Sequence, residues 1–262
     1  LASLTFTAQT PAQVASQAAQ ATALSTGTAS TSGGTITINA GSSVTAQRGA
    51  AITANAAIAP VPADNAQMSG AGGNINITAP QVTTQTNSLL QANGNNGPGG
   101  NFNLQATQLA IAGSVQAIGN TGGTITAVAN TSNISAGASL QANGNNGPGG
   151  AITLQTTQNQ VINNATVQAN GSGNGGNIQI TTTQGDINLQ SALIQTNGAA
   201  GRGGQIAIAA TNYTTLESST LEATGYTQGG TIRIGNDAQN QTIPFSIFTN
   251  LDASSILSAS QA

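Results

Sequence analysis

The sequence predicts an all-β chain folded as a parallel β-helix, also called a β-solenoid, and three recurring features carry this prediction. Gly-Gly pairs recur about every 26 residues, an alternation of apolar and polar residues follows each pair, and an Asn-Gly step precedes several of them. Alternation with a period of two is typical of a β-strand with one buried face. A long repeat of this kind indicates a solenoid, because one unit cannot bury its own apolar face.

The first strand of each unit is expected directly after the glycine pair, where apolar residues occupy alternate positions. The pairs begin at positions 33, 72, 99, 122, 149, 175, 203 and 229. In a parallel β-helix these apolar residues stack on one another from coil to coil. The predicted core ladder comprises Leu4, Phe6, Ile36, Ile38, Ile75, Ile77, Phe102, Leu104, Ile125, Ile152, Leu154, Ile178, Ile180, Ile206, Ile208, Ile232 and Ile234.

Two further strands are expected in each unit. The middle of the unit varies but keeps apolar residues such as Val82 and Ile134, and the unit ends in segments such as LQANGNNGPGG at 90–100 and 140–150. There Leu alternates with a small residue, as in another short strand. The Asn-Gly steps that begin at Asn93, Asn143, Asn170 and Asn197 supply residues that tolerate positive φ, which would let the chain turn sharply.

The predicted architecture is a single solenoid domain over residues 1–262, with three short strands in each coil. Counting the strand at Leu4 and Phe6 and the eight later starts gives about nine coils, or a rod on the order of 43 Å long at the strand spacing of a sheet. We expect ladders of Ile, Leu or Val, and Ala inside, and ladders of Asn, Thr and Gln outside.

Two segments depart from the repeat. Thr10-Pro11 followed by an Ala/Gln run to Ala23 is either an initial coil, which we favour, or a capping helix. The second departure is an inserted loop at about 56–69, which contains Pro60, Pro62 and Met68. It is either a tolerated excursion from the rod or a docking element.

The composition excludes several classes of function. Charged residues make up 3% of the chain, with 3 Lys or Arg, 6 Asp or Glu, and neither His nor Cys. We therefore expect no catalytic residue, cofactor or metal site, because imidazole, thiol and the usual zinc ligands are absent. Three Arg residues cannot neutralise a row of phosphates, so nucleic-acid binding is not expected. No apolar run approaches the roughly 20 residues that span a bilayer.

The repeat motifs resemble those of a known family. Gly72-Gly73-Asn74-Ile75-Asn76-Ile77 and the matching run from Gly175 to Ile180 resemble the haemagglutinin-like large exoproteins of bacteria, which include the filamentous-haemagglutinin class of adhesins. The resemblance covers nearly the whole chain. It implies a right-handed parallel β-helix that is secreted to the extracellular space or cell surface, with a role in adhesion, matrix or surface layers.

The terminal units suggest how such a rod would act. An open β-helix ends in unpaired strand edges, and the most apolar stretch of this chain is IPFSIF at 243–248. These rings either cap the rod or join copies head to tail into an extracellular filament, a heterologous contact that propagates. The candidate polymer contacts are Leu4, Phe6, Ile243, Phe245, Phe248, Ile256 and Leu257.

Two other functions compete with a structural filament. One is the rod segment of a secreted adhesin whose Thr, Asn and Gln faces contact cell-surface glycans. The other is an ice-binding face, which the mixed outward residues disfavour, as at Thr35 and Thr37 against Asn74 and Asn76.

Overall fold

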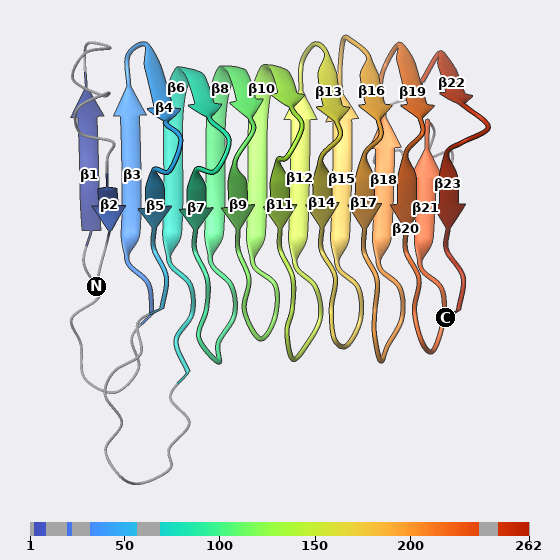
Figure 1. Ribbon diagram of the computed structural model, residues 1–262, viewed down its shortest axis with the longest axis horizontal. Helices are drawn as coiled ribbons and strands as arrows, with labels where there is room; N and C mark the ends of the chain where they lie inside the picture. Colours follow the sequence, from blue (N-terminus) through green and yellow to red (C-terminus); the bar gives the residue numbers. More distant parts are fainter. Residues whose placement is uncertain (1–2, 9–19, 23–31, 57–68, 236–245, 262) are drawn as a thin grey trace, which may run out of the picture.

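The computed structural model describes residues 3–8, 20–22, 32–56, 69–235 and 246–261, with side chains from residue 32 onward. The described part is all-β and contains no helix. It is a parallel β-solenoid in which each coil lies beside the next along one axis (Figure 1). The uninterrupted stretch 69–235 comprises about 6 coils.

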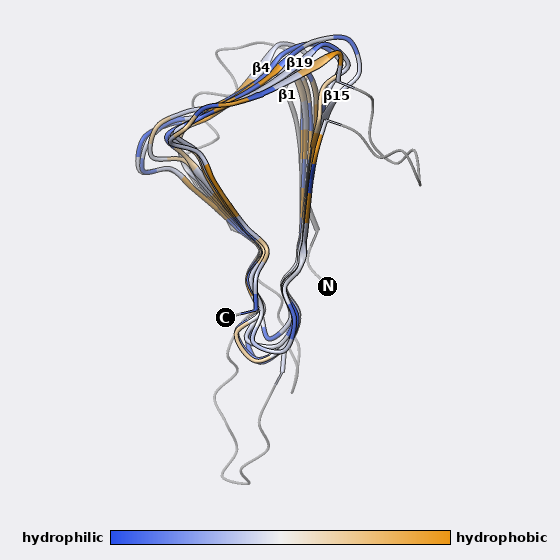
Figure 2. Ribbon diagram, turned by 90° about the vertical axis from the view of Figure 1, so that its right-hand side faces the viewer, coloured by the Kyte–Doolittle hydropathy of each residue, from blue (hydrophilic) through white to orange (hydrophobic). Residues whose placement is uncertain are grey.

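The coils enclose a roughly triangular cross-section with a narrow extension at one corner (Figure 2). The first side carries the long strands that follow the glycine pairs, and the second side carries short strands in the same 14-stranded sheet. The third side is a separate 9-stranded sheet. Every strand pair in both sheets is parallel, as the following bounds and registers describe.

The first side comprises β1 (Ser3–Ala8), β3 (Thr35–Ala40), β6 (Asn74–Thr84), β8 (Asn101–Ile111), β10 (Thr124–Ile134), β12 (Ala151–Thr156), β15 (Asn177–Thr182), β18 (Gln205–Ala209) and β21 (Thr231–Ile234). The second side comprises β4 (Ser43–Ala46), β13 (Gln160–Asn163), β16 (Ile187–Gln190), β19 (Tyr213–Glu217) and β22 (Phe248–Leu251). The third side comprises β2 (Gln20–Thr22), β5 (Ala51–Thr53), β7 (Leu89–Gln91), β9 (Ser114–Gln116), β11 (Ser139–Gln141), β14 (Thr166–Gln168), β17 (Leu193–Gln195), β20 (Thr220–Glu222) and β23 (Ile256–Ser258).

Three coils differ from the predicted three short strands, because β6, β8 and β10 each run as one 11-residue strand through the first and second sides. The length of the corner explains the difference. Ala129 pairs with Thr156 and Ser132 pairs with Gln160, so a step of three residues (129 to 132) faces a step of four (156 to 160). The added residue interrupts the strand at this corner, and β12 and β13 are separate.

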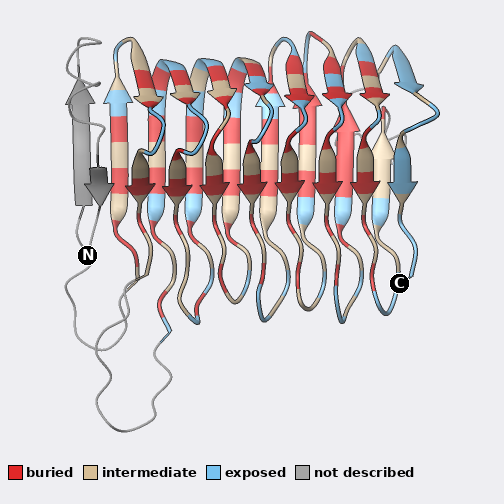
Figure 3. Cartoon of the chain, in the orientation of Figure 1, coloured by how far each residue is buried: buried red, intermediate tan, exposed pale blue. Residues whose placement is uncertain are grey.

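The predicted core ladder is buried from Ile36 to Ile208 and is only partly buried at its last two members. Ile75 pairs with Phe102, and Phe102 pairs with Ile125, so the three side chains are stacked neighbours. All predicted members from Ile36 to Ile208 are buried, and they belong to one continuous hydrophobic cluster (Figure 3). Ile232 and Ile234 in β21 are only partly buried against that cluster, because β21 is the last strand of its sheet.

The predictions for the first coil are partly covered by the described residues. β1 pairs with β3 so that Leu4 lies beside Ile36 and Phe6 beside Ile38, the registers expected of core positions. Gln20–Thr22 form a strand that pairs with β5, as an initial coil requires. The rest of the segment that could form a capping helix, and most of the inserted loop at 56–69, lie outside the described residues.

The glycine pairs allow two limbs of the chain to approach closely where the triangle narrows (Figure 2). The second glycine of a pair donates its backbone N–H across this glycine neck, as Gly150 does to the Ala142 carbonyl oxygen at 2.7 Å. A Cβ on Gly150 would lie 2.0 Å from the Gly123 carbonyl oxygen of the preceding coil. Only glycine fits there, because Cβ atoms do not approach backbone oxygens so closely.

The prediction of positive φ is wrong at the steps that begin at Asn93, Asn143, Asn170 and Asn197, whereas Asn96, in the neighbouring Asn96-Gly97 step, does have a positive φ. The non-glycine residues with positive φ include Asn87, Asn164, Ser191 and Ser218, and each lies two residues before a third-side strand, at a different corner. The Asn-Gly glycines are required by crowding instead, since a Cβ on Gly144 would lie 2.0 Å from the Pro148 carbonyl oxygen.

The asparagines of those steps bind successive coils together. The Oδ1 atom of Asn143 accepts the backbone N–H of Asn170 at 2.8 Å, and Asn170 does the same for Asn197 at 2.7 Å. Asn197 then accepts the N–H of Thr224 at 2.9 Å. The Asn-Gly steps therefore do mark bends of the chain, as predicted. The asparagines are needed there because they bind the backbone of the next coil.

Candidate functional site

The last coil leaves its strand edges without a neighbour in the described residues. β21 and β23 stand at the ends of their sheets, and β22 pairs only with β19. Unpaired backbone N–H and C=O groups on a strand edge can accept another strand. Within the described residues, both sheets therefore end in an unpaired strand edge at this coil, where Figure 3 colours β22 as exposed.

Apolar side chains are exposed on the same coil. Leu257 pairs with Leu221 and Leu251 pairs with Leu216, so both occupy positions of the internal ladders. Leu221 and Leu216 are fully buried, whereas Leu257 and Leu251 are each 42% exposed. The end of the rod is thus a cross-section through the core.

The predicted polymer contacts fall in different places on this end. Leu257 lies at an inward position, whereas Ile256 pairs with Thr220 on the outer surface and is 57% exposed. Phe248 also faces outward, where its ring lies 6.3 Å from the ring of Tyr213 on the preceding coil, between centroids. Ile243 and Phe245 lie outside the described residues, as do the side chains of Leu4 and Phe6.

Asp252 holds the bend between β22 and β23 against the preceding coil. Its two carboxylate oxygens accept the backbone N–H of Ser218 at 3.1 and 3.0 Å, and they accept the hydroxyls of Ser255 and Ser254 at 2.7 Å each. The hydroxyl of Ser255, followed by that of Ser254, lowers the pKa of Asp252 from 3.8 to about 2, because both bonds favour the charged form. The last coil is therefore ordered by a carboxylate as well as by strand pairing.

An amide ladder runs along the outer surface of the third side. The Nε2 atom of Gln91 donates to Oε1 of Gln116 at 2.7 Å, and the same bond links Gln116 to Gln141, Gln141 to Gln168 and Gln168 to Gln195. Gln195 donates to Oε2 of Glu222 at 2.6 Å, and Asn197 donates to the same oxygen at 3.1 Å. Every donor in this ladder points toward the C-terminal end of the rod.

The carboxylates of Asp186 and Glu217 have separate hydrogen-bond partners in the described coils. Asp186 accepts the backbone N–H of Tyr213 at 3.2 Å, and Glu217 accepts the side-chain amide of Gln190 at 3.4 Å. Among the described residues no three His, Cys, Asp or Glu side chains are grouped as a metal site. These acids act as hydrogen-bond acceptors between coils.

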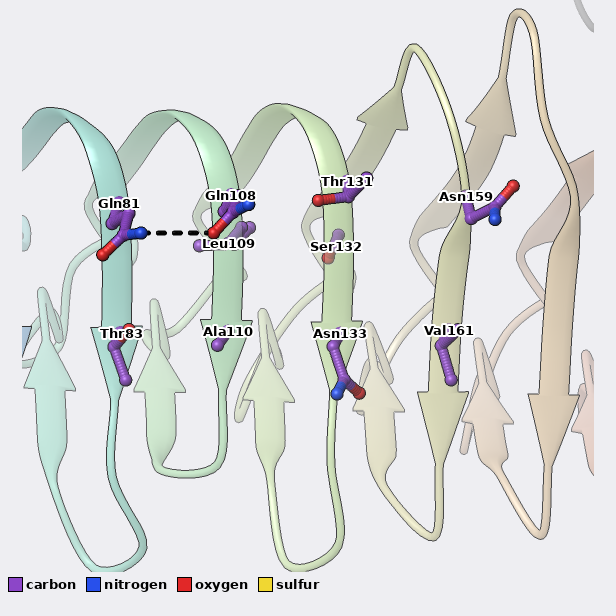
Figure 4. A pocket seen from close by; sticks show the side chains of 10 residues that line it. All are labelled: Gln81, Thr83, Gln108, Leu109, Ala110, Thr131, Ser132, Asn133, Asn159 and Val161. Atoms are coloured by element: carbon purple, nitrogen blue, oxygen red, sulfur yellow. Dashed lines mark hydrogen bonds between the residues drawn. The ribbon is translucent and has the colours of Figure 1, made fainter.

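A hollow of about 390 Å³ lies on the outer surface of the second side, where β6, β8, β10 and β13 run side by side (Figure 4). One wall is the row Gln81, Gln108, Thr131 and Asn159, and the other is the row Thr83, Ala110, Asn133 and Val161. Leu109 and Ser132 lie between the rows. We call this hollow the axial trough, because both walls run from coil to coil along the solenoid axis.

Sequence reasoning missed the axial trough. It depends on which outward residues of four successive coils fall in the same row, and on the small side chain of Ala110 in that row. The one signal in the sequence was that no charged residue occurs between Asp64 and Asp186, a stretch that contains the whole trough.

A second hollow, of about 590 Å³, follows the glycine neck over the coils from Gly122 to Gln205. Its walls are mostly glycine, with Thr124, Asn174, Asn177 and Arg202 among the side chains that reach it. It is more exposed to solvent and offers fewer side chains than the axial trough.

Comparisons of the chain with protein-family models, with curated proteins and with solved structures found no match. The resemblance to haemagglutinin-like exoproteins consequently stands on the repeat motifs alone. The described residues include no helix of the length and apolarity needed to cross a membrane.

Proposed function

We propose that this protein is a non-enzymatic, extracellular structural subunit whose copies stack head to tail into a fibre or a surface or matrix layer. The observation that carries the proposal is the open C-terminal coil, where the edges of both sheets and the ladder leucines Leu251 and Leu257 are exposed together. Unpaired edges and an apolar cross-section are features that proteins usually cover.

A second copy fits this end by continuing the same sheets. β1 would pair with β21 as each first-side strand pairs with the next, so that Leu4 lies beside Ile232 and Phe6 beside Ile234. Such a contact is heterologous, because one end meets the other, and it repeats without closure. The chain has a formal net charge of -3, so little electrostatic repulsion opposes the approach.

The proposal includes the finer features that the family resemblance implies. These are a right-handed winding, about nine coils in the rod, and secretion to the extracellular space or the cell surface. Their support is the resemblance of the Gly-Gly-Asn-Ile-x-Ile motifs to those of the haemagglutinin-like exoproteins, together with the eight glycine pairs that recur along the chain.

The experiment compares Leu257→Asp with Val128→Asp by electron microscopy and sedimentation at increasing protein concentration. The two positions are matched in exposure, at 42% and 40%, but Val128 lies on the side of the rod. We expect long unbranched filaments for the wild type and for Val128→Asp, and dispersed rods for Leu257→Asp with an unchanged β-rich circular dichroism spectrum. A wild type that stays dispersed at high concentration would overturn the proposal, as would filaments of Leu257→Asp.

The rod segment of a secreted adhesin is the alternative proposal. The observation that favours it is the axial trough, an uncharged polar hollow on the side of the rod. Dispersed wild-type rods that bind immobilised glycans would support this alternative over assembly.

Ice binding is a weaker alternative, because one outward row of the first side is mixed and contains, in order, Thr37, Asn76, Asn103, Thr126, Thr153 and Gln179. An ice recrystallisation assay tests it directly.

A further inference from the structure

The axial trough has the shape of a site for a linear molecule. Its walls are two rows of outward side chains that cross four coils, from Gln81 to Asn159 in one row and from Thr83 to Val161 in the other (Figure 4). Three intervals between neighbouring strands give a length on the order of 14 Å. A ligand in the trough would lie along the solenoid axis, across the strands, with its two edges against the two rows.

The chemistry of the walls selects an uncharged, hydrogen-bonding ligand. Gln81, Gln108, Asn133 and Asn159 present amides, which both donate and accept, and two threonines add hydroxyls. No charged side chain lines the trough, and the nearest charge in its rows is the carboxylate of Asp186, one coil beyond Asn159. An anionic ligand would therefore lose hydration and meet a like charge without gaining an ion pair. Ala110 and Val161 supply apolar surface that can contact the carbon atoms of a ligand.

A carbohydrate satisfies these walls better than a peptide does. The backbone N–H and C=O groups of the trough strands are already paired along the axis with neighbouring coils, as in the register of β6, β8 and β10. A peptide lying across the strands could therefore not add to the sheet through its backbone, which is how extended peptides usually bind to strands. Sugar hydroxyls, in contrast, pair singly with side-chain amides on both walls.

We propose that the axial trough binds a linear neutral oligosaccharide that runs parallel to the solenoid axis. Gln108 and Asn133 supply amide contacts from opposite walls, and the small side chain of Ala110 leaves room for a sugar ring beside them. The Nε2 atom of Gln81 donates to Oε1 of Gln108 at 3.3 Å, which orients both amides before a ligand arrives. This site is on the side of the rod and is independent of contacts at its ends.

The first test fills the trough with a side chain. Ala110→Tyr places a ring in the row that runs from Thr83 to Val161. Thr215→Tyr is the matched control, because Thr215 is a half-buried residue of the same row, two coils beyond the trough. Binding is measured by calorimetry and on an array with neutral linear trisaccharides as probes: cellotriose, laminaritriose, maltotriose, mannotriose and chitotriose. We expect at least one probe to bind the wild type and Thr215→Tyr equally, and Ala110→Tyr at least tenfold more weakly.

The second test removes donors without filling the space. Gln108→Leu and Asn133→Leu should each weaken binding of the same probe several-fold, while the circular dichroism spectrum stays that of the wild type. The proposal is overturned if no neutral trisaccharide binds the wild type, if acidic saccharides bind more tightly than neutral ones, or if Ala110→Tyr binds as the wild type does. Filament formation by Ala110→Tyr should be unaffected, which separates this test from that of end-to-end assembly.

Discussion

The middle of the rod and its last coil share one repeat but differ in burial and charge. Leu221 and Leu257 occupy successive positions of the same ladder, yet the first is fully buried and the second is 42% exposed. The middle coils contain no charged residue between Asp64 and Asp186, whereas Glu217, Glu222 and Asp252 lie in the last coils. In a solenoid, the alternation within a unit decides which residues point inward, and the neighbouring coil decides whether those residues are covered.

The largest effect that sharpens this comparison is expected at the glycine neck in the middle of the rod. Gly176→Ala places a Cβ 2.1 Å from the Gly150 carbonyl oxygen, so the backbone of two coils must shift. We expect a loss of about 4 kcal/mol or more in the free energy of unfolding, measured by chemical denaturation. The control is Gly173→Ala, where the nearest atom to the added Cβ lies at 3.4 Å. Equal stability of the two variants would show that the neck tolerates side chains.

A smaller effect separates the two regions within the core ladder. Ile125→Ala removes a fully buried side chain between two coils and should cost about 3 kcal/mol of stability. Ile232→Ala makes the same chemical change in β21, where the side chain is only partly buried, and should cost about 1 kcal/mol. Denaturation midpoints of the two variants check the difference. Equal losses would mean that the terminal coil is covered as fully as the middle, for example by a second copy.

The smallest effect is a pH dependence confined to the last coil. Asp252 has its pKa lowered from 3.8 to about 2 in the folded chain, so its bonds add stability that is fully present above pH 4 and is lost as the pH falls toward 2. The protection factor for hydrogen exchange at the amide of Ser218, which donates to this carboxylate, should fall across that interval. In Asp252→Asn this fall should be absent, and the protection factors of the middle-coil amides should not change in either protein.

The sequence predicted which residues point into the core and stack on one another, but not where the strands end at the corners of the coil. Ile75, Phe102 and Ile125 could be aligned because the period-two pattern and the glycine pairs recur together. The residue added between Thr156 and Gln160 leaves no such mark, since it changes only where one strand ends and the next begins.

Contacts between coils explain the other differences from the sequence prediction. The role of Asn143 depends on the backbone N–H of Asn170, which lies 27 residues away, and no local rule about Asn-Gly steps contains that contact. The axial trough depends on the alignment of four coils. At the end of the rod, the exposure of Leu257 could not be predicted from its own unit, which has the same pattern as the buried units.

The amide ladder gives the rod a built-in direction. Each glutamine from Gln91 to Gln168 places the positive end of its side-chain dipole against the negative end of the next, so the dipoles add along the rod and finish at the carboxylate of Glu222. Copies joined in tandem would carry their dipoles in the same sense. A fibre built from them would be polar, and its two ends would differ in electrostatic potential.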